Sequence, residues 1–174
     1  MDISTNYFDL FGLPVAYQVD SQALMVAYRN LQRHIHPDRY ASQSERDQRI
    51  AMQYASYTNQ ALEALRSPVG RAKYLLELAG ETSKEDNLGS DPVFLMEQME
   101  LREELSSLGG ERQSVAVLEH FIHARRQDLQ ALEQHFGLLY EAKDFDTARK
   151  IISKMQFILK LISQAEDMED DVLI

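Results

Sequence analysis

Residues 21–40, SQALMVAYRNLQRHIHPDRY, combine a helical pattern with an abrupt stop. Apolar side chains recur here every three or four residues, which predicts an amphipathic helix over about 21–35. Asp20 stands where a side chain can cap the first turn of that helix, and Pro37 cannot continue it. The stretch therefore predicts a helix that is followed by a tight turn.

A second helical pattern follows this turn. It runs over about residues 44–66, where Ile50 and Leu65 are expected to face the core. It ends before Pro68, because a proline disfavours the helical conformation of the residue that precedes it. The two helices are expected to lie antiparallel, with a short helix in YFDLFGLP, residues 7–14, packed over them.

The rest of the chain forms a separate helical part. Residues 79–92, AGETSKEDNLGSDP, contain two glycines, a proline and hardly any apolar side chain, which is typical of a linker. Three more helical stretches follow, over about 93–108, 112–140 and 144–170. We therefore expect an all-α protein in which a helical hairpin with short flanking helices, residues 1–78, is linked to a three-helix bundle, residues 93–174.

Composition and charge limit the classes of function. Residues 1–77 hold equal numbers of acidic and basic side chains, so residues 78–174 carry the whole net charge of −10. This charge disfavours nucleic acid as a partner. The absence of cysteine excludes disulfides and thiolate metal sites. No apolar run is long enough to span a membrane and the start does not match a signal peptide, so a cytoplasmic location is expected.

The turn at residues 34–42, HIHPDRYAS, has the residue types of a metal site. His34, His36 and Asp38 match part of a binuclear metallo-hydrolase signature, and imidazoles and carboxylates chelate zinc. That signature continues with a histidine where this chain has Arg39, and it follows a strand rather than a helix. A metal-dependent hydrolase is therefore the weaker hypothesis. A passive helical interaction protein, which binds a partner without stimulating any enzyme, is a further alternative.

The same turn is also suited to binding another protein. On a helical wheel Arg29 and Arg33 lie opposite the core face, and His36 continues their line. An exposed helix face that ends at a proline is the simpler interpretation of the two arginines. The pattern alone leaves both interpretations open.

The tripeptide His36-Pro37-Asp38 between two antiparallel helices resembles the J domain of Hsp70 co-chaperones. The similarity extends to YFDLFGLP before it and to NQALEALRSPVGRAKYLL, residues 59–76, after it. It implies that the turn and the basic helix dock on an Hsp70 and stimulate its ATPase. The residues so implied are Arg29, Arg33, His36, Pro37 and Asp38. The ATP chemistry would belong to the partner, and the chain itself would be no enzyme.

The helix over about residues 93–108 has more apolar side chains than one core face can hold. Phe94, Leu101 and Leu105 share one face and predict the seam with the rest of the bundle. A second group lies about 100–200° away on the helical wheel. This group consists of Leu95, Met96 and Met99, beside Glu100 and Glu103. It predicts a contact surface, since flexible methionine side chains adapt to a partner.

The last helix repeats this arrangement. Its main apolar face is expected to pack in the bundle, and Phe157, Leu161 and Met168 lie roughly opposite. These side chains could belong to the same contact surface, or the apolar middle helix could cover both stripes. The pattern alone does not decide between the two.

The predicted J domain, the linker and FLMEQMELREEL, residues 94–105, together resemble the HscB family of co-chaperones for iron–sulfur cluster biogenesis. The resemblance covers essentially the whole chain. It implies that the J domain engages the specialised Hsp70, HscA, and that the bundle binds the cluster scaffold IscU. The scaffold-binding residues it implies are Leu95, Met96, Met99, Glu100, Glu103 and Phe157. Ser107 stands where the family often has a further acid, and no cofactor, metal or oligomer beyond a monomer is required.

Overall fold

The protein is predominantly helical in the residues that the computed structural model describes, which are 5–35, 44–81, 91–109 and 114–173. Seven helices and no strand occur within these ranges. The all-α class predicted from the periodicity is therefore confirmed. None of the helices in these ranges is long and apolar enough to cross a membrane. The chain divides into two compact units, Met1–Gly80 and Glu81–Ile174.

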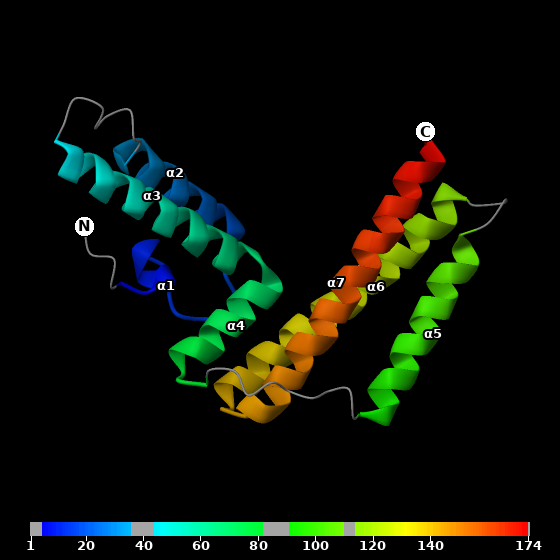
Figure 1. Ribbon diagram of the computed structural model, residues 1–174. Coiled ribbons are helices and arrows are strands. Elements are labelled where there is room, and N and C mark those ends of the chain that lie inside the picture. The colour runs from blue at the N-terminus through cyan, green and yellow to red at the C-terminus, as the bar shows by residue number, and fades with distance from the viewer. Residues whose placement is uncertain (1–4, 36–43, 82–90, 110–113, 174) are drawn as a thin grey trace. The chain divides into compact units, whose positions relative to one another are not determined.

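Four helices make up the described part of the first unit (Figure 1). They are α1 (Tyr7–Leu10), α2 (Ser21–Ile35), α3 (Glu45–Arg66) and α4 (Pro68–Leu78). The long helices α2 and α3 lie side by side as the hairpin that the sequence predicts. Both α1 and α4 pack against α3, which makes α3 the centre of this unit.

Polar side chains fix the ends of these helices. The Asp20 carboxylate accepts hydrogen bonds from the backbone N–H groups of Gln22 at 2.8 Å and Ala23 at 3.1 Å. This geometry confirms Asp20 as the cap of α2. Ser67 ends α3 and also caps α4, because its hydroxyl accepts a hydrogen bond from the Gly70 N–H at 3.1 Å. One residue thus turns the chain from one helix into the next.

Aromatic and aliphatic side chains form the core of the first unit. Phe8, Leu24 and Leu65 are buried, as the helical pattern predicts for Leu65. The prediction is wrong for Ile50, which is 37% exposed. Ile50 lies near the start of α3, where no described element covers it. The core thus occupies the part of the hairpin that faces α1 and α4.

Two tyrosines attach α1 to α4. The Tyr7 ring stacks on the Tyr74 ring with centroids 4.1 Å apart. The Tyr7 backbone N–H donates a hydrogen bond to the Tyr74 hydroxyl oxygen at 2.9 Å. Burial raises the pKa of both phenols above the ordinary value of a tyrosine. The start of α1 therefore depends on a side chain that lies 67 residues away.

The second unit contains α5 (Pro92–Leu108), α6 (Val115–Glu141) and α7 (Phe145–Leu173). The long helices α6 and α7 pack against each other along most of their length as an antiparallel hairpin (Figure 1). The shorter α5 packs on this hairpin through fewer residues. Fully buried side chains at the centre of the hairpin include Leu118, Phe136 and Met155. The α6–α7 hairpin therefore forms most of the core of this unit, and α5 packs on its surface.

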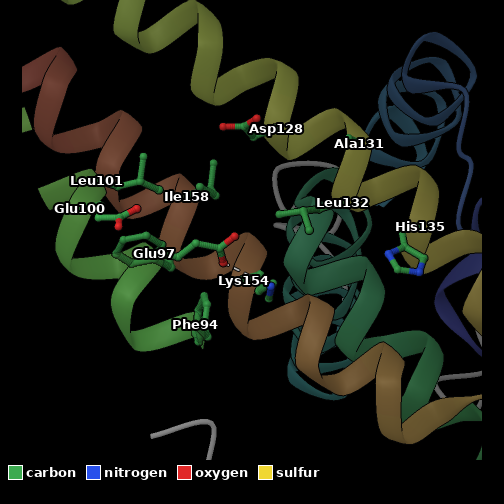
Figure 2. A pocket seen from close by; sticks show the side chains of 11 residues that line it. Phe94, Glu97, Glu100, Leu101, Asp128, Ala131, Leu132, His135, Lys154 and Ile158 are labelled. Carbon is green, nitrogen blue, oxygen red and sulfur yellow. Dashed lines mark hydrogen bonds and ion pairs between the residues drawn. The ribbon is translucent and has the colours of Figure 1, made fainter. Parts of the chain in front are cut away.

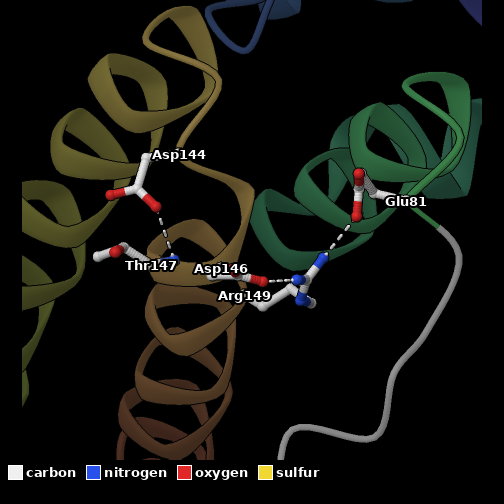
Figure 3. Close-up of polar contacts among 5 residues, drawn as sticks. All are labelled: Glu81, Asp144, Asp146, Thr147 and Arg149. Carbon is white, nitrogen blue, oxygen red and sulfur yellow. Dashed lines mark hydrogen bonds and ion pairs between the residues drawn. The ribbon is translucent and has the colours of Figure 1, made fainter.

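Polar contacts hold the turn between α6 and α7 (Figure 3). The Asp144 carboxylate accepts a hydrogen bond from the Thr147 backbone N–H at 3.2 Å. Hydrogen bonds from the Thr147 side chain and backbone lower the pKa of Asp144 below the ordinary value of an aspartate. Arg149 is buried, and its guanidinium pairs with Asp146 and, at 2.9 Å, with Glu81 at the start of this unit. The first turn of α7 is thus fixed on two sides.

Candidate functional site

The outer face of α5 presents large apolar side chains to solvent. Leu95, Met96 and Met99 are 40%, 62% and 69% exposed, whereas Phe94 and Leu105 on the same helix are buried. The two stripes that the helical wheel predicts for this helix are therefore confirmed as a buried seam and an exposed face. An exposed group of apolar side chains marks a candidate contact surface, because burying such groups against a partner is favourable.

Acidic side chains flank this apolar group. Glu100 and Glu103 are exposed on the same helix, and neither takes part in an ion pair within the residues that the structure describes. We call Leu95, Met96, Met99, Glu100 and Glu103 the α5 patch. Its chemistry suits a partner surface that combines apolar side chains with lysine or arginine.

Phe157, which the family resemblance implies as a scaffold-binding residue, lies in the bundle core rather than on an exposed face. Its side chain is 8% exposed, its ring packs edge-on against Phe94 with centroids 6.0 Å apart, and the Arg102 guanidinium lies 5.4 Å from its centroid. Leu161 is likewise buried. Both belong to one core cluster with residues of α5 and α6. The physical reason is that α7 packs against two helices, and α5 packs against its second apolar face.

Ion pairs at the edge of this packing surface connect α5 to both other helices. Lys154 Nζ on α7 lies 3.3 Å from Glu97 Oε2 and 5.3 Å from the centroid of the Phe94 ring. Arg125 Nη1 on α6 lies 3.5 Å from Glu104 Oε2. The carboxylates of both pairs are exposed, so each pair contributes little on its own, but together they fix the side of α5 that faces the hairpin. The α5 patch is left on the other side.

A groove of about 430 Å³ opens between α5, α6 and α7 (Figure 2). Its apolar walls are formed by Phe94, Leu101, Leu132, Phe157 and Ile158, and its polar groups by Glu97, Glu100, Asp128, His135 and Lys154. Ala131 completes the α6 side. Glu100 belongs both to the groove and to the α5 patch. The groove residues on α6 and Lys154 were not predicted as site residues, because no periodicity within one helix indicates them.

The structure describes the basic helix α2 of the first unit, but not the turn that follows it. Arg29 and Arg33 are exposed on α2, as the helical wheel predicts. His36, Pro37 and Asp38 lie outside the residues that the structure describes, so their arrangement as a turn stays a prediction. The same holds for a metal site there, although His34 Nδ1 already donates a hydrogen bond to the Asn30 carbonyl at 2.7 Å.

Comparisons with known proteins agree on one family. The family described as HSCB C-terminal oligomerisation domain matches residues 90–166. Chaperone HscB from Vibrio cholerae is 38% identical, with a TM-score of 0.87 over 97% of this chain and 99% of that one. The human co-chaperone protein HscB is 26% identical, with a TM-score of 0.84 over 95% and 83% of the two chains. The Jac1 co-chaperone from Saccharomyces cerevisiae, 22% identical at a TM-score of 0.69 over 94% and 98%, shares the fold.

Proposed function

The chain belongs to the HscB family of J-type co-chaperones in iron–sulfur cluster assembly, and we propose that it delivers the scaffold IscU to the Hsp70 chaperone HscA and stimulates the ATPase of HscA. In this proposal the second unit binds the scaffold and the first unit engages the chaperone. The chain supplies contacts only, because ATP hydrolysis takes place in the partner.

The exposed α5 patch is the observation that supports scaffold binding. Covering a leucine or methionine side chain completely is worth about 1.5–3 kcal/mol, and three such side chains lie together here. The exposed Glu100 and Glu103 would add pairing with basic groups of IscU and would discriminate against acidic proteins. We therefore propose that the α5 patch contacts IscU. Phe157 supports this surface indirectly, because its ring packs against Phe94 of α5.

Arg29 and Arg33 support the proposed binding of HscA. Both are exposed on one helix, and exposed arginines accelerate association with an acidic surface. We propose that His36, Pro37 and Asp38 follow them as the loop that contacts the chaperone, with Asp38 pairing with a basic group of HscA. Pro37 would fix the turn.

Joining the two sites in one chain gives the protein its proposed effect. When IscU and HscA bind the same chain, their encounter becomes intramolecular, and the effective concentration of one near the other rises. A monomer is sufficient for this role, and the chain needs no cofactor or cluster of its own. The proposed location is the cytoplasm.

A matched pair of methionine variants tests the scaffold site. Met96 on α5 and Met52 on α3 have the same exposed fraction of 62%, so both substitutions by alanine remove a similar area at little cost to folding. Met96→Ala is expected to weaken IscU binding by about 1–2 kcal/mol, as an interface residue does, and Met52→Ala should leave it unchanged. Titration calorimetry with IscU measures both. Equal affinities of the two variants would refute the assignment of the α5 patch.

A further inference from the structure

We propose that the groove between α5, α6 and α7 is a second part of the scaffold-binding surface, which receives an apolar side chain of the scaffold together with a neighbouring lysine or arginine. This inference rests on the proposed function. It assigns a binding role to Asp128, Ala131, Leu132 and His135 on α6, which lie outside the α5 patch.

The volume and walls of the groove suit an apolar side chain. A volume of about 430 Å³ falls within the range of about 300–1,000 Å³ that is usual for binding pockets. Phe94, Phe157 and Ile158 line the groove and also belong to the core cluster, so they are held in place before a partner arrives. A preformed apolar site lowers the entropic cost of binding.

The charges of the groove leave one carboxylate for a cation. Glu97 pairs with Lys154 at 3.3 Å, and Asp128 pairs with Arg125 at 2.8 Å. Glu100 takes part in no ion pair in the described part of the chain. A basic side chain of the partner that reaches Glu100 would therefore complete the charge balance at the mouth of the groove.

The position of Glu100 identifies the occupant. Glu100 lines the groove and also belongs to the α5 patch, so a partner that covers the patch lies at the entrance of the groove. Glu97 of α5 and Lys154 of α7 line the same groove and pair with each other (Figure 2). The occupant is therefore a segment of the same scaffold protein, whose apolar residue follows or precedes a basic one.

Filling the groove tests the apolar half of this proposal. Ala131 is exposed and lines the groove, so Ala131→Trp occupies the space without disturbing the core. Ala116→Trp makes the same change at an exposed position of α6 outside the groove. In titrations with IscU, Ala131→Trp is expected to weaken binding about tenfold or more, and Ala116→Trp less than about twofold. Thermal unfolding of both variants checks that the fold is intact.

Adding a positive charge tests the cationic half. His135 lines the groove, and His123 is an exposed histidine of the same helix outside it. His135→Lys should repel the incoming cation and weaken IscU binding at low salt, whereas His123→Lys should not. An unchanged or tighter affinity of His135→Lys would overturn the cationic half even if Ala131→Trp weakens binding.

Other results would overturn the proposal in distinguishable ways. If Ala131→Trp binds IscU as the wild type does while Met96→Ala binds weakly, the groove is no part of the surface and the proposed function stands. If the wild type does not bind IscU, the proposed function itself fails. Light scattering of the free protein adds one more outcome: a change of its mass caused by Ala131→Trp would make a second copy of this chain the occupant.

Discussion

Replacement of Phe157 by alanine is expected to destabilise the second unit rather than to remove a surface contact. The ring is buried against Phe94 and covered by the Arg102 guanidinium. Removing a buried aromatic side chain costs about 3–5 kcal/mol, and the cost is lowest where neighbours or water fill the space. Because Phe157 borders an open groove, we expect the lower end of this range, about 3 kcal/mol.

This free energy corresponds to a large change of the unfolding temperature. For a unit of the size of residues 81–174, each 1 kcal/mol lowers Tm by roughly 4–8 °C. Phe157→Ala should therefore lower the Tm of the second unit by about 12–24 °C. Calorimetry of the full chain measures this shift, and the transition of the first unit serves as an internal reference, since Phe157 is no part of it. Met96→Ala should leave both transitions in place because Met96 is exposed.

The opposite pattern would refute this reasoning. The Tm of the second unit could change by less than about 2 °C in Phe157→Ala, far below the expected shift, while the affinity for IscU falls tenfold. This result would show that Phe157 acts at the surface. Phe157 would then belong with the α5 patch, as the family resemblance implies, and its assignment to the core would be wrong.

Three further variants test other parts of the structure. Tyr74→Phe leaves the Tyr7 N–H without its acceptor and should cost the first unit about 1 kcal/mol in denaturant unfolding. Burial raises the pKa of both phenols. The stability that the two protonated phenols contribute is therefore complete below about pH 10 and is lost as the pH rises through their folded-state pKa values. Tyr74→Phe should make the first unit lose less stability at alkaline pH. Asp144→Ala should lower the Tm at pH 7. Because the pKa of Asp144 is lowered, the carboxylate stabilises the fold above about pH 3.9. The difference in Tm between Asp144→Ala and the wild type should therefore disappear in stronger acid. Arg29→Glu should slow association with HscA in stopped-flow measurements at low salt, and a rate equal to that of wild type would exclude steering by this residue.

The helical wheel separated the α5 patch from the buried seam because the residues of α5 that pack on the other two helices share one face. Phe94 and Leu105 turn toward the α6–α7 hairpin, so Met96 and Met99, which lie on other faces of the helix, remain in water. Local chemistry was equally informative for Asp20, whose carboxylate caps α2 through backbone contacts within three residues. A helix cap and the faces of a single helix depend only on residues that are close in the sequence, so the sequence alone can predict them.

The same method could not decide whether the second apolar stripe of α7 is covered, because it treats one helix at a time. The wheel places Phe157 and Leu161 away from the main apolar face, but it contains no information about how many helices pack against α7. In the structure α5 occupies the second face. Ile50 was predicted to face the core, but a residue in a correct helical pattern stays exposed where none of the described elements covers it.

The groove could not be predicted for a related reason. Its charged groups come from three helices: Glu100 from α5, Asp128 from α6 and Lys154 from α7. Their proximity depends on the packing of α5 on the hairpin, which no spacing within a helix indicates. Only tertiary structure brings Glu100, which has no ion pair among the described residues, next to the apolar wall of the groove.

Single-turnover ATP hydrolysis by HscA, measured with and without IscU, tests the proposed co-chaperone role most directly. The wild-type chain should accelerate hydrolysis, and more strongly when IscU is present. Asp38→Asn should abolish the acceleration while IscU binding and the unfolding temperature stay as in the wild type. Undiminished acceleration by Asp38→Asn, or none by the wild type, would contradict the account.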